Sequence, residues 1–181
     1  MILNIQPLNI EGYSFEQNRQ IEDRLENILQ GWDGTPYCPG QQCKGVAVDC
    51  VRFVSGVLDE MFNLTNVLER LPQDASFHNP DLVKNGLRSF LKKYPCGPLD
   101  ASSPNEIEVQ PLDVVIMGPK NGGPGHAGIV GVHGFWHCNP YGVAQAGLEI
   151  EYGGVYNYKG VRRGVDRELW YDIMIGESNG K

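Results

Sequence analysis

The sequence predicts an α+β fold. Apolar residues recur at helical spacing in the first half of the chain, whereas short β-branched and aromatic segments separated by glycine fill the second half. The chain has 181 residues and contains no linker long enough to divide it, so one domain spanning 1–181 is expected. Helices first and strands second are typical of N-terminal helices packed on a C-terminal antiparallel sheet.

The first predicted helix follows Ser14 and ends near Gly31. Ser14 and Gln17 have the spacing of a capping box, in which each side chain bonds to the backbone of the other residue. The apolar positions that follow lie on one helical face: Ile21, Leu25, Ile28 and Leu29. Residues 31–49 (GWDGTPYCPGQQCKGVAVD) are rich in glycine and proline and therefore predict a loop.

A second helix is predicted to begin at Cys50, with Asp49 as its N-cap and as one partner of a salt bridge. Its apolar stripe comprises Val51, Val54, Val57, Leu58, Met61 and Phe62. A third helix is predicted from Pro80 to about Tyr94. Five later segments predict the strands: LDVVIM (112–117), HAGIVGV (126–132), FWHC (135–138), GVAQAGLEIEY (142–152) and ELWYDIMI (168–175).

Charge and composition exclude several classes of function. A net charge of −7 offers no basic surface for nucleic acid, and no segment approaches the ~20 apolar residues that span a bilayer. The N-terminal residues lack the basic and apolar regions of a secretory signal, so a soluble protein made in the cytoplasm is expected. Five cysteines cannot all pair, so at least one thiol is free; Cys38 and Cys43 form either a disulfide or two free thiols.

Cys50 is the candidate nucleophile. A cysteine attacks an acyl carbon as the thiolate, and the partial positive charge at a helix N-terminus favours that anion. Cys50 opens the second helix, whereas the other cysteines lie in a loop, a turn or a strand: Cys38, Cys43, Cys96 and Cys138. Position alone leaves open that Cys50 is simply a small buried residue.

Two histidines supply a candidate base and its orienting partner. His126 opens one predicted strand and His137 lies on the next, with Gly131 and Gly134 available for the turn. A two-residue hairpin loop pairs residues whose numbers have an odd sum, as these two do, so both side chains share one face of the sheet. Cys138 then points to the other face, which argues against it as a rival nucleophile. Two structural histidines at strand ends are the alternative.

Five short motifs follow one another along the chain: GTPY (34–37), VDCVRFV (48–54), DVVIM (113–117), HAGIV (126–130) and an aromatic-His pair (136–137). Together they resemble the NlpC family of cell-wall cysteine endopeptidases over about residues 31–145, which leaves 1–30 and 146–181 as extensions atypical of that family. The resemblance implies a compact papain-like fold. It also implies hydrolysis of an amide bond in peptidoglycan stem peptides, typically between γ-D-glutamate and a diamino acid.

The resemblance also implies roles for four residues. Cys50 would be the nucleophile that forms a thioester acyl-enzyme, His126 the general base and His137 the residue that orients it. Tyr37 would lie close to the thiol, and the backbone N–H of Cys50 would help to hold the oxyanion. No cofactor and no metal ion are expected.

The chain departs from the family pattern beside the expected site. The family has Trp-Gly-Gly after the tyrosine and Ser-Gly after the cysteine, where this chain has CPG (38–40) and VR (51–52). Leu112 replaces a glycine. The interval from His126 to His137 is one residue shorter than the family's, so His133, in the predicted turn, is an alternative third residue. An acyltransferase or other amidase with the same Cys–His machinery, or a non-catalytic wall-binding structural protein, stays open as the function.

The expected substrate is a peptidoglycan stem peptide or muropeptide. Without a secretory signal, a wall hydrolase needs carriage on a phage tail, a dedicated secretion apparatus or release by lysis. The expected protein partner is accordingly a phage tail protein, a secretion component or an immunity protein.

Overall fold

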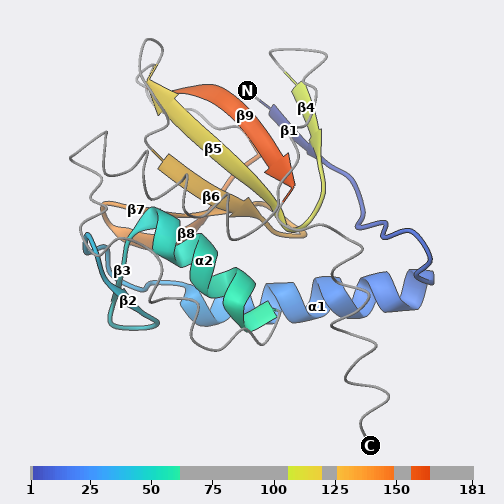
Figure 1. The fold of residues 1–181 in the computed structure, drawn as a ribbon, viewed down its shortest axis with the longest axis horizontal. Helices are drawn as coiled ribbons and strands as arrows, with labels where there is room; N and C mark the ends of the chain where they lie inside the picture. Colours follow the sequence, from blue (N-terminus) through green and yellow to red (C-terminus); the bar gives the residue numbers. More distant parts are fainter. Residues whose placement is uncertain (1, 62–105, 120–125, 149–155, 164–181) are drawn as a thin grey trace, which may run out of the picture.

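Two helices lie against one face of a five-stranded sheet in the computed structural model of this chain (Figure 1). The structure describes residues 2–61, 106–119, 126–148 and 156–163. Its elements are β1 (Ile2–Ile5), α1 (Phe15–Trp32), β2 (Gln42–Cys43), β3 (Ala47–Val48), α2 (Cys50–Met61), β4 (Glu106–Val109), β5 (Asp113–Pro119), β6 (His126–Val130), β7 (Phe135–Asn139), β8 (Gly142–Ala146) and β9 (Tyr156–Arg163). The predicted α+β class is confirmed.

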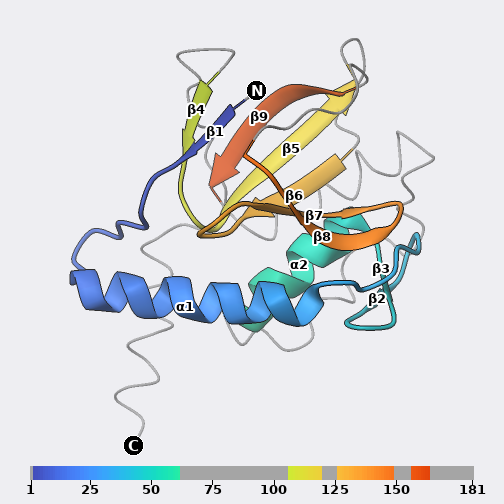
Figure 2. The same ribbon diagram turned by 180° about the vertical axis from the view of Figure 1, so that it is seen from behind.

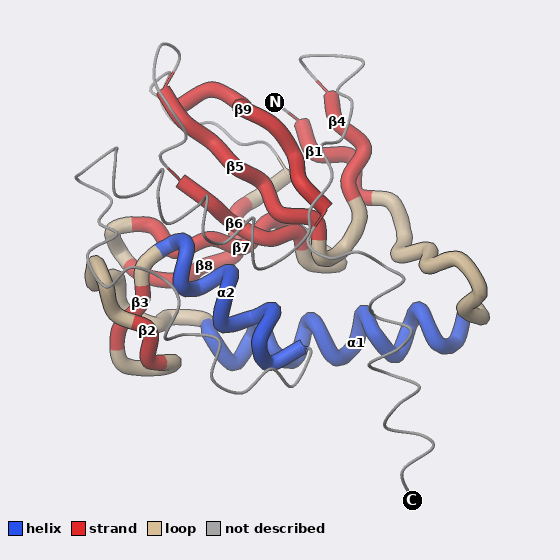
Figure 3. Tube along the Cα trace, viewed as in Figure 1, coloured by secondary structure: helices blue, strands red, loops and turns tan. Residues whose placement is uncertain are grey.

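The large sheet has the strand order β8-β7-β6-β5-β9 (Figure 3), and each neighbouring pair is antiparallel. β1 and β4 form a separate parallel pair, and β2 and β3 form a short antiparallel hairpin. The sequence predicts β5 to β8 but not β1, β4 or β9. It also predicts residues 31–49 as a loop, whereas the structure places the short hairpin of β2 and β3 there. The third predicted helix (80–94) and the predicted strand at 168–175 lie outside the described residues.

α1 confirms the helix predicted after Ser14. The Ser14 hydroxyl accepts a hydrogen bond from the Gln17 amide at 3.2 Å, and the Ser14 amide donates to the Gln17 side chain at 2.8 Å, which completes the capping box. Its buried apolar positions include Ile21, Leu25 and Leu29. Seen from behind, α1 runs beneath the sheet and crosses α2 (Figure 2). Within the described parts of the chain, neither helix is long and apolar enough to cross a membrane.

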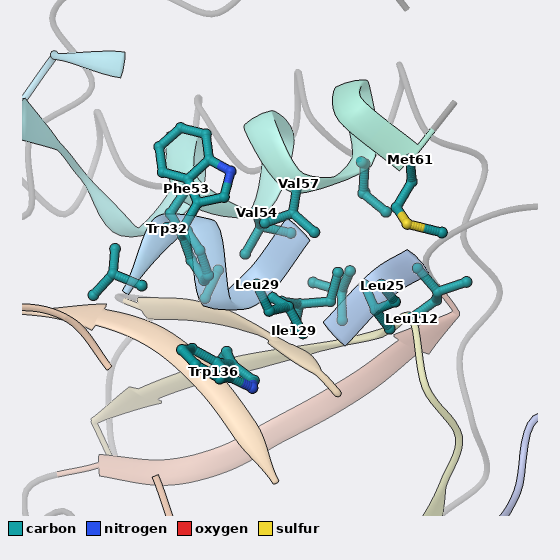
Figure 4. Packing of buried hydrophobic residues seen from close by; sticks show 14 of the residues in the cluster. Leu25, Leu29, Trp32, Phe53, Val54, Val57, Met61, Leu112, Ile129 and Trp136 are labelled. Carbon is teal, nitrogen blue, oxygen red and sulfur yellow. The ribbon is translucent and has the colours of Figure 1, made fainter. Parts of the chain in front are cut away.

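The main core fills the space between the helices and the sheet (Figure 4). Trp32 of α1 packs edge-on against Phe53 of α2, with ring centroids 5.8 Å apart. From the sheet, residues that include Ile129 and Trp136 join this cluster. A second cluster occupies the opposite face of the sheet and joins it to β1 and β4: Leu3, Ile107, Val109, Val115, Val130 and Phe135. Successive residues of β6 and β7 thus alternate between two apolar layers.

Gly128, in the middle of β6, is required by close packing. A Cβ atom there would lie 2.5 Å from the backbone oxygen of Trp136 and would also overlap the ring of Phe135. We expect Gly128→Ala to destabilise the protein by roughly 1–3 kcal/mol because a backbone atom has little room to move. Gly147→Ala, where nothing lies within 4 Å, is the matched control. Thermal unfolding measures both, and equal melting temperatures would contradict this packing.

Candidate active site

Cys50 is the first residue of α2, as predicted. Asp49 caps the helix: its Oδ1 accepts from the Arg52 amide at 2.9 Å, and its Oδ2 forms a buried ion pair with the Arg52 guanidinium. The same Oδ2 accepts from the Gly40 amide at 2.9 Å, which ties the preceding loop to the helix. The predicted cap and salt bridge of Asp49 are therefore confirmed. The partner of Asp49 is Arg52, which was not expected from the sequence, although Asp and Arg three residues apart at the start of a helix are a usable signal.

Tyr37 lies in the segment that runs beside Val48, just before α2. The Val48 amide donates to the Pro36 carbonyl and the Cys38 amide donates to the Val48 carbonyl, both at 2.9 Å. Burial raises the pKa of the Tyr37 phenol, and a negative charge on Cys50 raises it further. Tyr37 and the Cys50 thiol are thus close enough to interact electrostatically.

The Cys50 thiol is protonated in this setting. Burial and, second, the Asp49 carboxylate raise its pKa to about 12, against the lowering effect of hydrogen bonds from backbone amides, including that of Ala127. The sequence-based expectation is the reverse, because a helix N-terminus and a nearby imidazole both favour the thiolate. The side chain is only 3% exposed, so the thiolate loses more hydration than these amides replace. A proton must therefore leave the thiol as it reacts.

His126 and His137 are hydrogen-bonded to each other. Nε2 of His126 lies 2.8 Å from Nδ1 of His137, and the ring planes are inclined by 78°. The loop between their strands has four residues (131–134) instead of two, and Gly128 pairs with His137. Because this loop also has an even number of residues, the numbers of paired residues still have an odd sum. The prediction that His126 and His137 share one face of the sheet is therefore confirmed. His133 lies in this loop and is exposed, as expected.

Both histidines are neutral at neutral pH. Burial lowers the pKa of His126 to about 3, with a further contribution from the charge of His137, and burial lowers the pKa of His137 to about 4. A bond between two neutral imidazoles needs one N–H donor and one bare nitrogen, so the pair fixes the tautomers relative to each other. A neutral imidazole is also the form that can accept a proton.

This pair makes the protein acid-sensitive. In the unfolded chain these two imidazoles bind protons near pH 6.5, whereas in the folded chain they do not until about pH 3–4. The stabilisation is therefore complete above pH 6.5 and is lost as the pH falls. We expect the unfolding free energy to fall by about 2 kcal/mol per buried histidine between pH 6.5 and 5. Denaturant unfolding at these pH values measures it. The exposed His133→Gln variant should retain the whole effect, and a constant unfolding free energy in the wild type would contradict it.

β6 and β7 present different side chains to the two faces of the sheet. The side chains that pack with the helices are Ala127, Ile129, Trp136 and Cys138. Those of the opposite layer include Val130 and Phe135. By alternation, His126 and His137 lie on the layer of Phe135, whose ring centroid is 5.4 Å from that of His137. Cys138 does point away from the two histidines, but the face that it occupies is the one covered by α2.

Cys50 meets β6 at the beginning of that strand. The Ala127 amide hydrogen-bonds the thiol, and His126 is the residue immediately before Ala127. β6 pairs with β7 only from Gly128 to Val130. His126 and Ala127 therefore lie beyond the last of these pairs. A contact between the thiol and the His126 ring has to form around this strand end, because the imidazole projects from the other face.

Nothing in the described residues indicates a metal centre. Across residues 2–61, 106–119, 126–148 and 156–163, no group of three or more His, Cys, Asp and Glu side chains could hold a metal ion. Cys38 and Cys43, whose state the sequence leaves open, are both free thiols.

No known protein family matches the chain, and a search of curated proteins finds no match either.

Proposed function

We propose that this protein is a cysteine hydrolase that cleaves an amide bond in peptidoglycan stem peptides. The observation that supports it best is the meeting of two elements: a cysteine at the first residue of α2, and a strand that opens with a hydrogen-bonded histidine pair. The Ala127 amide links the two by bonding the Cys50 thiol. The substrate class, with the bond between γ-D-glutamate and a diamino acid as its target, rests on the resemblance of the motifs.

The proposed reaction begins from a neutral thiol and a neutral imidazole. His137 engages Nε2 of His126, so Nδ1, on the other side of that ring, would take the thiol proton as sulfur attacks the carbonyl. Nε2–H of His126 would then donate to His137 and stabilise the imidazolium. The backbone N–H of Cys50 would hold the oxyanion, and Tyr37 would position the carbonyl beside it. The imidazolium returns its proton to the leaving amine, and water hydrolyses the thioester.

Incubation with purified muropeptides, followed by mass spectrometry of the products, tests the proposal. Hydrolysis should yield two fragments, one with a new amino group on the diamino acid, and the Cys50→Ala variant should yield neither. Unchanged muropeptides with properly folded wild-type protein would contradict it. Appearance of the acyl fragment on an added amine, in place of the free acid, would identify an acyltransferase.

His137 should matter less than the nucleophile or the base. We expect His137→Ala to impair turnover measurably without abolishing it, since it removes one hydrogen bond that orients His126. His137→Asn should recover part of the rate because its amide oxygen can still accept from the imidazole. The exposed His133→Ala variant is the control and should be nearly silent. If His133→Ala were the damaging change under the same muropeptide assay, His137 would lose this role.

A further inference from the structure

Two buried thiols lie on elements that pack together: Cys50 opens α2, and Cys138 is on β7. Cys50 is 3% exposed and Cys138 is 2% exposed, and both belong to the core cluster between the helices and the sheet. Both are free thiols. The hydrolytic reaction proposed above uses Cys50 alone and gives Cys138 no role.

The β6–β7 register brings Cys138 close to the strand end that meets Cys50. Gly128 pairs with His137 in the last β6–β7 pair, and the residues next to that pair, Ala127 and Cys138, both belong to the core cluster on the face covered by α2. Ala127 is the residue whose amide hydrogen-bonds the Cys50 thiol. Side chains that oppose each other on one face have Cβ atoms about 4.5–5.5 Å apart, so Cys138 reaches the surroundings of that amide.

A second contact fixes Cys138 from the other side. Its Sγ lies 3.3 Å from the carbonyl oxygen of Val48, two residues before Cys50. Burial raises the pKa of the Cys138 thiol, and a negative charge on Cys50 raises it further, as expected for two close sulfur atoms. Cys138 therefore lies between the segment that leads into α2 and the strand that meets its first residue.

We propose that Cys50 and Cys138 form a reversible disulfide when the protein meets a hydroperoxide. The thiolate of Cys50 attacks the peroxide, the O–O bond breaks, and the sulfur becomes a sulfenic acid, while the departing oxygen takes up the proton that the thiol lost and leaves as the alcohol or as water. The Cys138 thiol then attacks that sulfur, the S–O bond breaks, and water leaves. Two thiols lose two electrons in total, and the peroxide gains them. A dithiol reductant restores both thiols.

The disulfide would protect the sulfur of Cys50. A sulfenic acid without a nearby thiol proceeds to sulfinic acid, which most cells cannot reverse. Since both thiols are largely protonated at neutral pH, the oxidation should be slow there and accelerate as the pH rises.

Peptide mapping tests the linkage in the full chain. Tryptic peptides 45–52 and 121–159 each contain one cysteine, Cys50 and Cys138 respectively. After hydrogen peroxide and alkylation of remaining thiols, the two peptides should appear joined, and dithiothreitol should separate them. The exposed Cys43→Ser variant should give the same joined pair. In Cys138→Ala, peptide 45–52 should instead carry sulfinic or sulfonic acid.

Two outcomes would overturn the inference. One is a sulfinic acid on Cys50 in the wild type while Cys138 stays fully alkylated. The other is a joined product in which Cys50 is bound to a cysteine other than Cys138. Because the linkage is read by mass, it can succeed or fail independently of the proposed hydrolase activity.

Discussion

Cys50→Ala should lose essentially all muropeptide hydrolysis, with kcat falling roughly 10⁴- to 10⁶-fold. The sulfur is the atom that forms the acyl-enzyme, and alanine leaves nothing in its place to attack the carbonyl. The fold should survive, because alanine occupies less volume at the first position of α2 and leaves the Asp49 cap unchanged. Product formation measured by mass spectrometry gives the rate, and circular dichroism and thermal unfolding confirm the fold.

The exposed thiol of Cys43 supplies the control for this variant. Cys43→Ala also removes one sulfur, but from the short β2–β3 hairpin, and it should leave kcat/KM unchanged. Retention of activity in Cys50→Ala would contradict the nucleophile assignment. Loss in Cys138→Ala together with retention in Cys50→Ala would move that role to the neighbouring thiol.

His126→Ala should lower kcat/KM by roughly 10²- to 10⁴-fold, the usual contribution of a general base. The pH dependence is the more specific readout. The wild-type rate should hold well below pH 6.5, because the pKa of His126 is lowered to about 3 and the base stays unprotonated. Without the base, the rate should follow the thiolate fraction and rise about tenfold per pH unit, because the pKa of Cys50 is raised to about 12.

Initial rates between pH 5 and 9, with folding confirmed at each pH, measure this difference. The exposed His133→Ala variant should show the wild-type profile. Parallel profiles for the wild type and His126→Ala would mean that His126 does not take the thiol proton.

Features that depend on neighbours within a few residues are predictable from the sequence. The capping box of Ser14 and Gln17 and the Asp49 cap of α2 each join residues three positions apart. The predicted strands from β5 to β8 follow from local runs of apolar residues bounded by glycine. Alternation along a strand is equally local, so the shared face of His126 and His137 follows even though the loop length differs from the one assumed.

Strands whose partners are distant in the chain are not predictable in this way. β1 pairs with β4, about a hundred residues later. β4 does alternate charged and apolar residues (EIEV), but nothing in its own sequence identifies β1 as its partner. β9 contains Gly160 and several basic residues, which hide its strand character.

Leu112 adopts a positive φ of 75°, which glycine tolerates best, and the buried position of its side chain offsets part of that strain.

The sequence by itself determined the positions of α1, α2 and the strands β5 to β8, the caps of the two helices and which side chains share a face, because each depends on local spacing. The tertiary structure alone decided which face meets the helices. It thereby placed Cys138 beneath α2 and the histidine pair in the opposite layer. It also decided the protonation of the site: a helix N-terminus favours a thiolate, but burial and the Asp49 charge are stronger here, and both arise from packing of segments far apart in the chain.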